Sequence, residues 1–366
     1  MNKVLVLEGR DSIGGGQIVT KFICDGLNHD LDVSIFLPGN KKSHLAKLLG
    51  DFKKYYYYQR PYSYGKKNWK DYVKFCVNCI SVGFALVKTL NKVKPILLYV
   101  QNVRILPILC LLNMVYRIPI VAHIHVVFVD SNVRWLVNKL LESKHVVKIV
   151  GVSEYTLGQL SINNKRKCTV IYNAVNNRKK VSHLTLSGNI AIIGDVYPLK
   201  GHDVLFKAIS MSNLNLRIHV VGKVVDQKYK KHLDETYPNV SCVYPGILDD
   251  VESYLYDERI DLTVVPSISS ETFSLAMIES WAQSIPTIAT NDYGMSELVR
   301  TFLPEFSEIM LFDKGNASDL LDKIKILENN KEIYDKVSNA VLHVAEDKFS
   351  VATFNDKIRT IVANEI

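Results

Sequence analysis

The 366-residue sequence is poor in cysteine and has no long uninterrupted apolar run. Its six cysteines are scattered, and the one C-x-x-C pair, Cys76 and Cys79, has no second pair at zinc-ligand spacing. The most apolar stretch, residues 95–116, is broken by polar residues and a proline, whereas a spanning helix needs about 20 largely apolar residues. We expect no secretory leader, because the first apolar run, Val4–Leu7, follows only three residues and has the pattern of a strand. We therefore expect a reduced cytosolic setting, no metal or redox role for the cysteines, and no membrane-spanning helix.

Several other classes of protein are excluded by composition. Hydrophobic residues make up 48% of the chain and charged residues 22%, which excludes intrinsic disorder, a collagen-like fibre and a disulfide-stapled small domain. The length exceeds that of one small core and falls short of three full domains. Two compact domains are therefore predicted.

Charge is divided unevenly along the chain. Residues 1–180 contain 28 Lys and Arg against 10 Asp and Glu, whereas residues 181–366 contain the remaining 17 against 27. A basic half suits nucleic acid, an anionic membrane face or an acidic ligand, and charge alone leaves these three partners open.

Short apolar runs alternate with longer amphipathic stretches, which is typical of parallel strands joined by helices. The pattern lapses near 176–188, so we predict an N-terminal domain over 1–182, a C-terminal domain over 183–345 and a final helical segment over 346–366 that packs back on the first domain. Each domain is expected to be α/β, a doubly wound, Rossmann-like parallel sheet with its ligands at the carboxyl ends of the strands, in a cleft between the domains. The predicted strands are 4–7, 33–37, 96–100, 120–125, 148–152, 169–172, 190–193, 218–221, 240–244, 262–265, 287–289 and 309–312.

Two predicted strand ends in the first domain carry glycine or histidine. The first strand leads into Gly14, Gly15 and Gly16, where a ligand can approach the backbone at a helix start, although neither a Walker loop nor G-x-G-x-x-G is present and a tight turn is the plain alternative. The strand at 120–125 ends in His123 and His125, which alternate and so share one face. His125, nearer the end of the strand, is the candidate for contact with a ligand or a reacting hydroxyl.

In the second domain, Gly194 and Lys200 follow the first strand. A lysine there neutralises a phosphate, or is simply a solvated loop residue.

The sharpest local signal is the pair Glu271 and Glu279, which follows the strand at 262–265. A helix predicted to begin near Phe273 would leave the amides of Phe273, Ser274 and Leu275 free for a diphosphate, flanked by two carboxylates for the hydroxyls of a sugar and a ribose. The alternative is an acidic residue on the helix dipole plus a surface glutamate.

At this point the sequence resembles the family-four retaining glycosyltransferases, which have the GT-B fold of two Rossmann-like domains facing a cleft. The E-x7-E spacing of Glu271 and Glu279 is similar to the signature of that family, and further segments follow in the order of the family over almost the whole chain. These segments include Gly14–Gly16, the strand ending in His125, Gly194 with Lys200, Tyr244–Gly246, Ala282–Pro286 and Gly294–Glu297.

The resemblance implies transfer of a sugar from a nucleotide diphosphate sugar to an acceptor hydroxyl, with no metal and no cofactor other than the donor. Glu271 would contact hexose hydroxyls, Glu279 the ribose and Lys200 the diphosphate, while the backbone at Ile247 would hold the base and His125 would orient the sugar or acceptor. The implied catalytic residues are Glu271, His125 and Lys200, and the implied donor-binding residues are Gly15, Gly16, Gly194, Lys200, Ile247, Phe273, Ser274, Leu275 and Glu279.

The sequence departs from the family pattern at several positions. Asp195 stands where the family usually has an arginine on the diphosphate, and Thr272, Ser274 and Ser284 replace usual glycines. We expect these changes to narrow the sugar pocket and to leave the diphosphate site with one cation fewer, so that diphosphate binding is weaker or is completed elsewhere.

The basic first half suits an acceptor that bears phosphate, such as a glycan on polyprenyl diphosphate at the inner face of a membrane. Residues 53–60 and 64–70 interleave aromatic and cationic residues, as segments that touch membranes peripherally do. Two alternatives remain: a non-catalytic glycosyltransferase-like subunit that activates a partner, and a basic nucleic-acid-binding module. We expect the enzyme, with no nucleic-acid partner.

Overall fold

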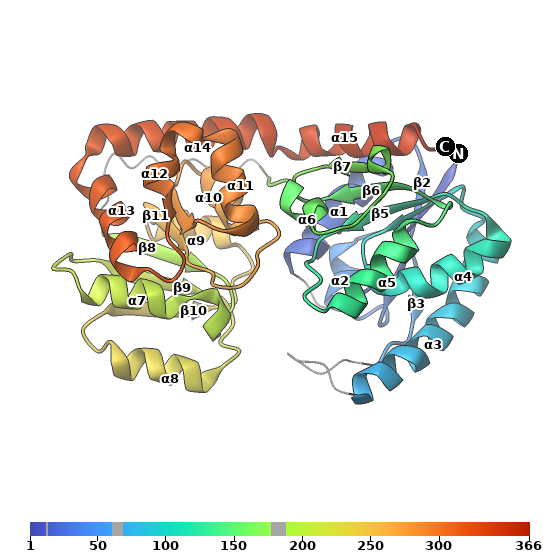
Figure 1. Ribbon diagram of the computed structural model, residues 1–366, viewed down its shortest axis with the longest axis horizontal. Coiled ribbons are helices and arrows are strands. Elements are labelled where there is room, and N and C mark those ends of the chain that lie inside the picture. The colour runs from blue at the N-terminus through green and yellow to red at the C-terminus, as the bar shows by residue number, and fades with distance from the viewer. Residues whose placement is uncertain (12–13, 61–68, 177–187) are drawn as a thin grey trace. The chain divides into compact units, whose positions relative to one another are not determined.

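The computed structural model describes residues 1–11, 14–60, 69–176 and 188–366 (Figure 1). Contacts within the chain divide it into two compact units. Unit 1 comprises Met1–Tyr172 and Phe354–Ile366, and unit 2 comprises Asn173–Thr353. The domain boundary predicted at 182/183 falls outside the described residues.

Unit 1 is built on a seven-stranded sheet in which all the strands are parallel. The spatial order is β3-β2-β1-β4-β5-β6-β7, so the chain extends the sheet in one direction from β1 to β3 and then in the other from β4 to β7. The strands are β1 (Lys3–Leu7), β2 (Asp32–Pro38), β3 (Lys53–Tyr57), β4 (Leu97–Val100), β5 (Ile120–Ile124), β6 (Val146–Gly151) and β7 (Cys168–Val170).

The edge strand β3 was missing from the predicted set, which was therefore incomplete. Its sequence, Lys-Lys-Tyr-Tyr-Tyr, lacks the aliphatic residues that mark the other strands, yet Tyr57 is buried and stacks on Phe36 with ring centroids 4.6 Å apart. Tyr55 also packs against the core of unit 1. These two tyrosines of the aromatic segment 53–60 are thus core residues, while Tyr58 is exposed.

The helices of unit 1 cover this sheet. The longest, α3 (Trp69–Val93), is the one described helix whose length and composition would allow it to cross a membrane. In the structure one of its faces packs on β2, β3 and α4, so it is a helix of the folded unit. The helices are α1 (Gly15–Leu27), α2 (His44–Leu48), α3 (Trp69–Val93), η1 (Val103–Ile105), α4 (Leu106–Tyr116), α5 (Ser131–Leu141), α6 (Glu154–Gly158), η2 (Lys165–Lys167) and α15 (Val351–Ala363).

Unit 2 contains a six-stranded parallel sheet in the order β10-β9-β8-β11-β12-β13. All six strands predicted for the second half are present, although the last begins at Leu311 because Ile309 and Met310 complete a short helix. The strands are β8 (Asn189–Ile193), β9 (Arg217–Val221), β10 (Ser241–Gly246), β11 (Leu262–Val265), β12 (Thr287–Thr290) and β13 (Leu311–Phe312).

An aromatic cluster around Phe349 holds the helices of unit 2 together. Phe349 is fully buried, and its ring centroid lies 5.2 Å from that of Phe302, 6.1 Å from that of Phe273 and 6.2 Å from that of Trp281. The helices are η3 (Pro198–Lys200), α7 (His202–Ser210), α8 (Gln227–Thr236), α9 (Val251–Asp257), α10 (Leu275–Trp281), α11 (Tyr293–Phe302), η4 (Pro304–Phe306), α12 (Ser307–Met310), α13 (Ala317–Asn329) and α14 (Lys331–Lys348).

The substitution Phe349→Ala is expected to lower the free energy of unfolding by about 3–5 kcal/mol, because it leaves a cavity among three aromatic rings. Urea unfolding followed by tryptophan fluorescence measures this, since Trp281 lies in the same cluster. The matched control is Phe84→Ala, whose side chain is 77% exposed and whose loss is expected to cost no more than about 0.5 kcal/mol. Equal losses in the two variants would contradict the assignment of this core.

Candidate functional site

The strand order of unit 2 creates a switch point between β8 and β11. These neighbours pair in parallel, but the chain continues from β8 toward β10 on one side and from β11 toward β13 on the other. The loops that follow the two strands therefore diverge, and open parallel sheets bind ligands at this position.

Lys200 and Glu271 come together from the loops on either side of this switch point. The Nζ of Lys200 lies 2.6 Å from Oε1 of Glu271, to which the hydroxyl of Ser267 also donates at 2.8 Å. The side chains of Lys200 and Glu271 are only 26% and 20% exposed, so the alternative of a solvated loop lysine does not hold. Burial acts to lower the pKa of Lys200, but the Glu271 carboxylate outweighs it and raises that pKa, which keeps the ammonium charged.

Backbone contacts fix these loops against one another. The amide of Ile268, after β11, donates to the carbonyl of Leu199, after β8, at 3.1 Å. Gly201 has φ +72° and lies against the carbonyl of Pro266, where a Cβ atom would approach the oxygen to 2.0 Å. The amide of Gly294, after β12, donates to the carbonyl of Glu271 at 3.0 Å. Three successive strand ends thus hold the ion pair in place.

The loop after β8 brings Gly194 next to the lysine. A Cβ atom at Gly194 would lie 3.6 Å from Cε of Lys200, and its φ of +153° favours glycine. The exposed Asp195 accepts from the backbone amide of Lys223 at 3.3 Å, and its charge adds to the raised pKa of Lys200. The residue that replaces the usual arginine is therefore close enough to act on the same cation.

The helix after Glu271 begins later than the sequence predicted. Ser274 is the N-cap, with its hydroxyl accepting from the amide of Met277 at 3.4 Å, and the helix proper starts at Leu275. Phe273 is buried with its ring against Phe349, so its side chain anchors the loop in the core. Ile247 lies on the loop after β10 with its side chain 73% exposed.

Glu279 lies on α10, where it is half-buried. Burial raises the pKa of its carboxyl group to about 7, and the nearby Glu252 adds to the shift. Its half-buried position differs from that of the ordinary surface glutamate considered as the alternative.

Unit 1 has its own switch point, between β1 and β4. The loop after β1 carries Gly15 and Gly16, which form the first turn of α1. This loop is organised by Glu8, a residue that the sequence analysis did not single out. Burial raises the pKa of Glu8, whose carboxylate accepts from the amides of Gly9 and Arg10 at 2.7 and 3.1 Å. The hydroxyl of Thr20 donates to its second oxygen at 2.8 Å, which joins the loop to α1.

His123 in β5 and His125 directly after this strand lie together, as their alternation predicted. Their ring centroids are 4.2 Å apart, and Nε2 of His125 lies 2.6 Å from Oε1 of Gln101, a buried residue that follows β4 and was not predicted. The hydroxyl of Tyr99 lies 3.1 Å from Nδ1 of His123. Burial lowers the pKa of His125 to about 4, so its imidazole is neutral at pH 7.

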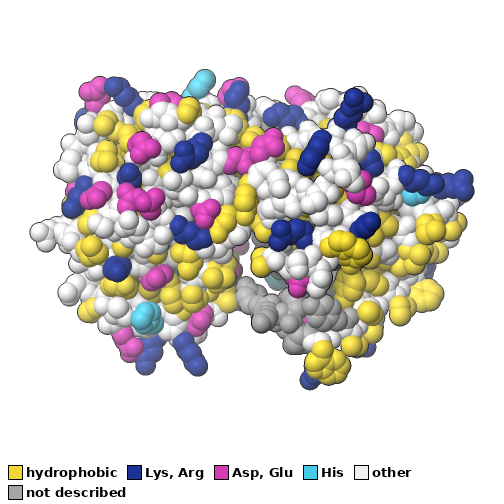
Figure 2. Space-filling view, in the orientation of Figure 1, with side chains coloured by type: hydrophobic (Ala, Val, Ile, Leu, Met, Phe, Trp, Pro, Cys, Tyr) yellow, Lys and Arg dark blue, Asp and Glu magenta, His cyan; other side chains and the backbone are white. Residues whose placement is uncertain are grey.

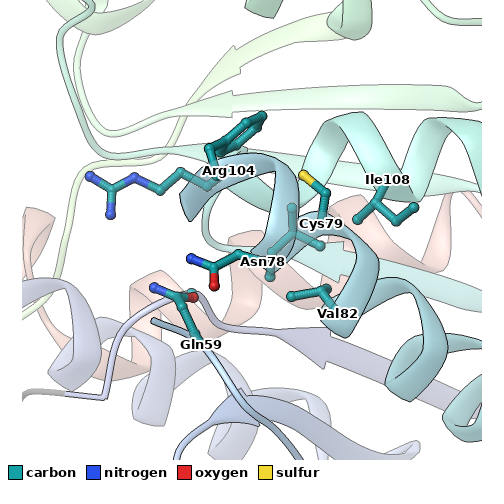
Figure 3. Close-up of a pocket in the computed structure, with 9 residues that line it drawn as sticks. Gln59, Asn78, Cys79, Val82, Arg104 and Ile108 are labelled. Atoms are coloured by element: carbon teal, nitrogen blue, oxygen red, sulfur yellow. The ribbon is translucent and has the colours of Figure 1, made fainter. Parts of the chain in front are cut away.

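A small pocket opens at the same sheet edge of unit 1 (Figure 3). It is lined by Gly9 after β1, by Gln59 after β3, and by residues of α3, η1 and α4 that include Asn78 and Arg104. Figure 3 shows the amides of Gln59 and Asn78 next to each other, with the guanidinium group of Arg104 extending away from Cys79. This pocket was not predicted, because its residues come from five separate segments.

The architecture and sequence of the chain are similar to those of known proteins. Residues 161–343, half of the chain, match the family model described as "Glycosyl transferases group 1". The chain belongs to this family. It is 32% identical over 187 residues to the uncharacterized glycosyltransferase MJ1178 of Methanocaldococcus jannaschii and covers 51% of that protein, about half its length.

Several solved structures share the fold over nearly the whole chain. Anabaena Alr3699/HepE in complex with UDP and glucose matches with a TM-score of 0.82 and 17% identity, covering 99% of this chain and 100% of that one. Sucrose-phosphate synthase from Thermosynechococcus elongatus matches with a TM-score of 0.77 and 14% identity, covering 100% and 99%. The predicted GT-B fold is thereby confirmed.

The described part of the chain contains no group of three or more His, Cys, Asp or Glu side chains placed to hold a metal ion. All six cysteines are free thiols, and Cys76 and Cys79 lie on α3.

The raised pKa of Glu279 predicts a pH-dependent stability. Between the ordinary value of 4.5 and about 7 the folded protein holds a proton that the unfolded chain has lost, so the contribution of Glu279 to stability falls across this range and stays low above it. The quantity to compare is the free energy of unfolding of Glu279→Gln minus that of the wild type. This difference is expected to be larger at pH 8 than at pH 4.5 by on the order of 2–3 kcal/mol, in favour of the variant. Urea unfolding at both pH values measures this, and an unchanged difference would contradict the burial of a protonated carboxyl group.

Proposed function

We propose that this group 1 glycosyltransferase moves a hexose-type sugar from a nucleotide diphosphate sugar to a hydroxyl of a glycan or lipid-linked glycan, with retention of configuration and without a metal. The observation that carries the proposal is the Lys200–Glu271 pair at the switch point of unit 2. A buried cation beside a carboxylate suits a ligand that has a diphosphate next to a polyhydroxylated ring. The HepE structures are complexes with UDP and glucose and with UDP-glucose, which supports a nucleotide sugar as the donor.

In the proposed donor complex, Lys200 stabilises the negative charge that develops on the departing diphosphate. Its raised pKa keeps it cationic throughout the reaction. Glu271 accepts from hexose hydroxyls, and because Ser267 and Lys200 both donate to its Oε1, its second oxygen is the one directed to the sugar. The amides of Ser274 and Leu275 and the backbone at Gly194 complete the diphosphate site, while Phe273 anchors its loop.

The other donor contacts follow from the same strand ends. The backbone at Ile247 holds the base and Glu279 binds the ribose, where its protonated form donates and its ionised form accepts. Retention proceeds on the front face of the sugar, with the leaving phosphate as the base, so no protein nucleophile is required.

Unit 1 supplies the acceptor side of the proposed reaction. Neutral His125, oriented by Gln101, hydrogen-bonds the donor sugar or acceptor hydroxyl, and the backbone at Gly15 and Gly16 allows close approach of the ligand. Arg104 at the rim of the pocket in Figure 3 suits an acceptor with a polyprenyl diphosphate. The enzyme accordingly acts in the cytoplasm, at the inner face of a membrane, in polysaccharide or glycoconjugate synthesis.

A non-catalytic subunit that activates a partner transferase is the second candidate. Asp195 favours it, because this residue places a negative charge where the family usually has an arginine. The intact Lys200–Glu271 pair favours the enzyme.

Donor binding is expected to stabilise the protein against heat. Thermal unfolding is measured with UDP, GDP, dTDP and ADP and with their common sugars, and a donor at 100 times its dissociation constant adds about 2.7 kcal/mol. A shift with one class of nucleotide is the expected result. No shift with any of them would move the assignment to the non-catalytic subunit.

Glu271→Gln is expected to reduce sugar transfer about 100-fold or more, because it removes the charge while keeping an oxygen that accepts from Lys200 and Ser267. Release of the nucleotide in the presence of a glycan acceptor measures the rate. Glu308→Gln, at an exposed glutamate of the same unit, is the matched control and should retain full activity. Full activity of Glu271→Gln would exclude this residue from the site.

A further inference from the structure

Helix α3 has two apolar faces. The inner face is buried against β2, β3 and α4. The outer face exposes Trp69, Val73, Ile80 and Phe84, with exposed fractions of 70%, 52%, 62% and 77%, and Cys76 continues the same line. Steps of three and four residues place these side chains on one side of the helix. The inner face is made of Val82, Leu86, Leu90 and Val93.

The neighbouring helix α4 extends this outer face. A Cβ atom at Gly83 would lie 3.1 Å from Cδ1 of Ile108, and the hydroxyl of Tyr116 donates to Oδ1 of Asn91 at 2.9 Å. In each contact the two partners are 25 positions apart in the sequence. The two helices therefore run in the same direction, side by side. Figure 2 shows hydrophobic side chains gathered over this part of unit 1. On α4 the exposed residues are Leu111, Met114 and Val115, with exposed fractions of 61%, 68% and 80%.

The charges on these two helices and on the segment that joins them are almost all positive. Residues 69–117 contain seven Lys and Arg and a single acid, Asp71, which is 3% exposed and lies 3.7 Å from Lys74. Lys70, Lys88 and Arg117 are exposed on the two helices or at their ends. An apolar centre bordered by cations complements an anionic bilayer, in which acyl chains lie beneath acidic headgroups. It does not complement a second copy of itself, because the cations of two copies would repel each other.

We propose that the outer face of α3 and α4 docks unit 1 on an anionic lipid bilayer. Ile80, Phe84, Leu111 and Met114 enter the acyl region, while the lysines stay at the level of the headgroups. The helix lies along the surface and does not cross it, because crossing would expose its inner face, where the buried Asn78 exchanges hydrogen bonds with the backbone of Arg60 at 2.8 and 3.1 Å.

This docking goes beyond the proposed transfer reaction and requires neither donor nor acceptor. It also differs from the predicted contact through residues 53–60, since two tyrosines of that segment are core residues. The attraction is expected to weaken as salt rises, because the cations contribute through screened interactions.

The test is sedimentation of the full chain with vesicles of phosphatidylcholine, alone or with roughly 30% phosphatidylglycerol. The wild type is expected to bind the anionic vesicles about tenfold or more better than the neutral ones, and Ile80→Asp with Phe84→Asp to lower that binding about tenfold or more. The matched control is Met211→Asp with Ile326→Asp, at exposed apolar positions of unit 2, and should bind within about twofold of the wild type.

Three results would overturn the proposal: no binding of the wild type to either kind of vesicle, unchanged binding of the Ile80→Asp, Phe84→Asp variant, or a wild-type dimer that this variant dissociates while no vesicle binding is seen. The last result would identify the face as a protein interface. Circular dichroism and the thermal shift with nucleotide sugar show whether the variant is folded. Loss of vesicle binding with a retained nucleotide shift separates a failure of docking from a failure of the proposed transfer reaction.

Discussion

The ion pair between Lys200 and Glu271 depends on the order of the strands beneath it. The two residues are 71 positions apart, and they meet because β8 and β11 pair in parallel while their following loops diverge. The pair also has a cost, since removing both side chains from water is unfavourable unless each finds a partner. In this unit the partners find each other at 2.6 Å. A ligand that replaces one partner of the pair must accept from Lys200 or donate to Glu271. The pair therefore discriminates between ligands by the hydrogen-bonding groups that they carry.

Glycine makes the packing of the surrounding loops possible. A Cβ atom at Gly222 would meet the carbonyl of Gly194 at 2.3 Å, and one at Gly294 would meet the carbonyl of Thr272 at 2.2 Å. Because these residues lack side chains, the backbones of the loops that follow neighbouring strands can pack directly against one another. The two usual glycines replaced by Thr272 and Ser274 flank Phe273, whose ring is held in the core, so the loop keeps its anchor while its freedom is reduced.

Much of this architecture could be predicted from the sequence, because aliphatic runs of four or five residues identify the buried parallel strands. The prediction failed for features that depend on contacts between residues far apart in the sequence. The strand β3 is made of lysines and tyrosines, and pairing with β2 becomes evident only when Tyr57 stacks on Phe36. The role of Glu8 could not be predicted, because the sequence alone does not distinguish a glutamate that is buried and hydrogen-bonded to its loop from one that is exposed to water. The exposed apolar face of α3 was not predicted, because apolar residues occur on both sides of this helix. Their spacing in the sequence does not show which side packs against the sheet and which side faces solvent.

Unit 1 is made of two pieces of chain that are separated by the whole of unit 2. Its last piece, residues 354–366, contributes Phe354, Ile358 and Val362 to the interior, and Asn355 packs so closely on Gly26 that a Cβ atom there would lie 2.6 Å from its side chain. During synthesis the seven strands of unit 1 emerge first, yet the surface that α15 covers stays open until unit 2 has been made. The unit that begins folding first is therefore the last to be completed, and a nascent chain carries an unfinished apolar surface until residues 354–366 have been made.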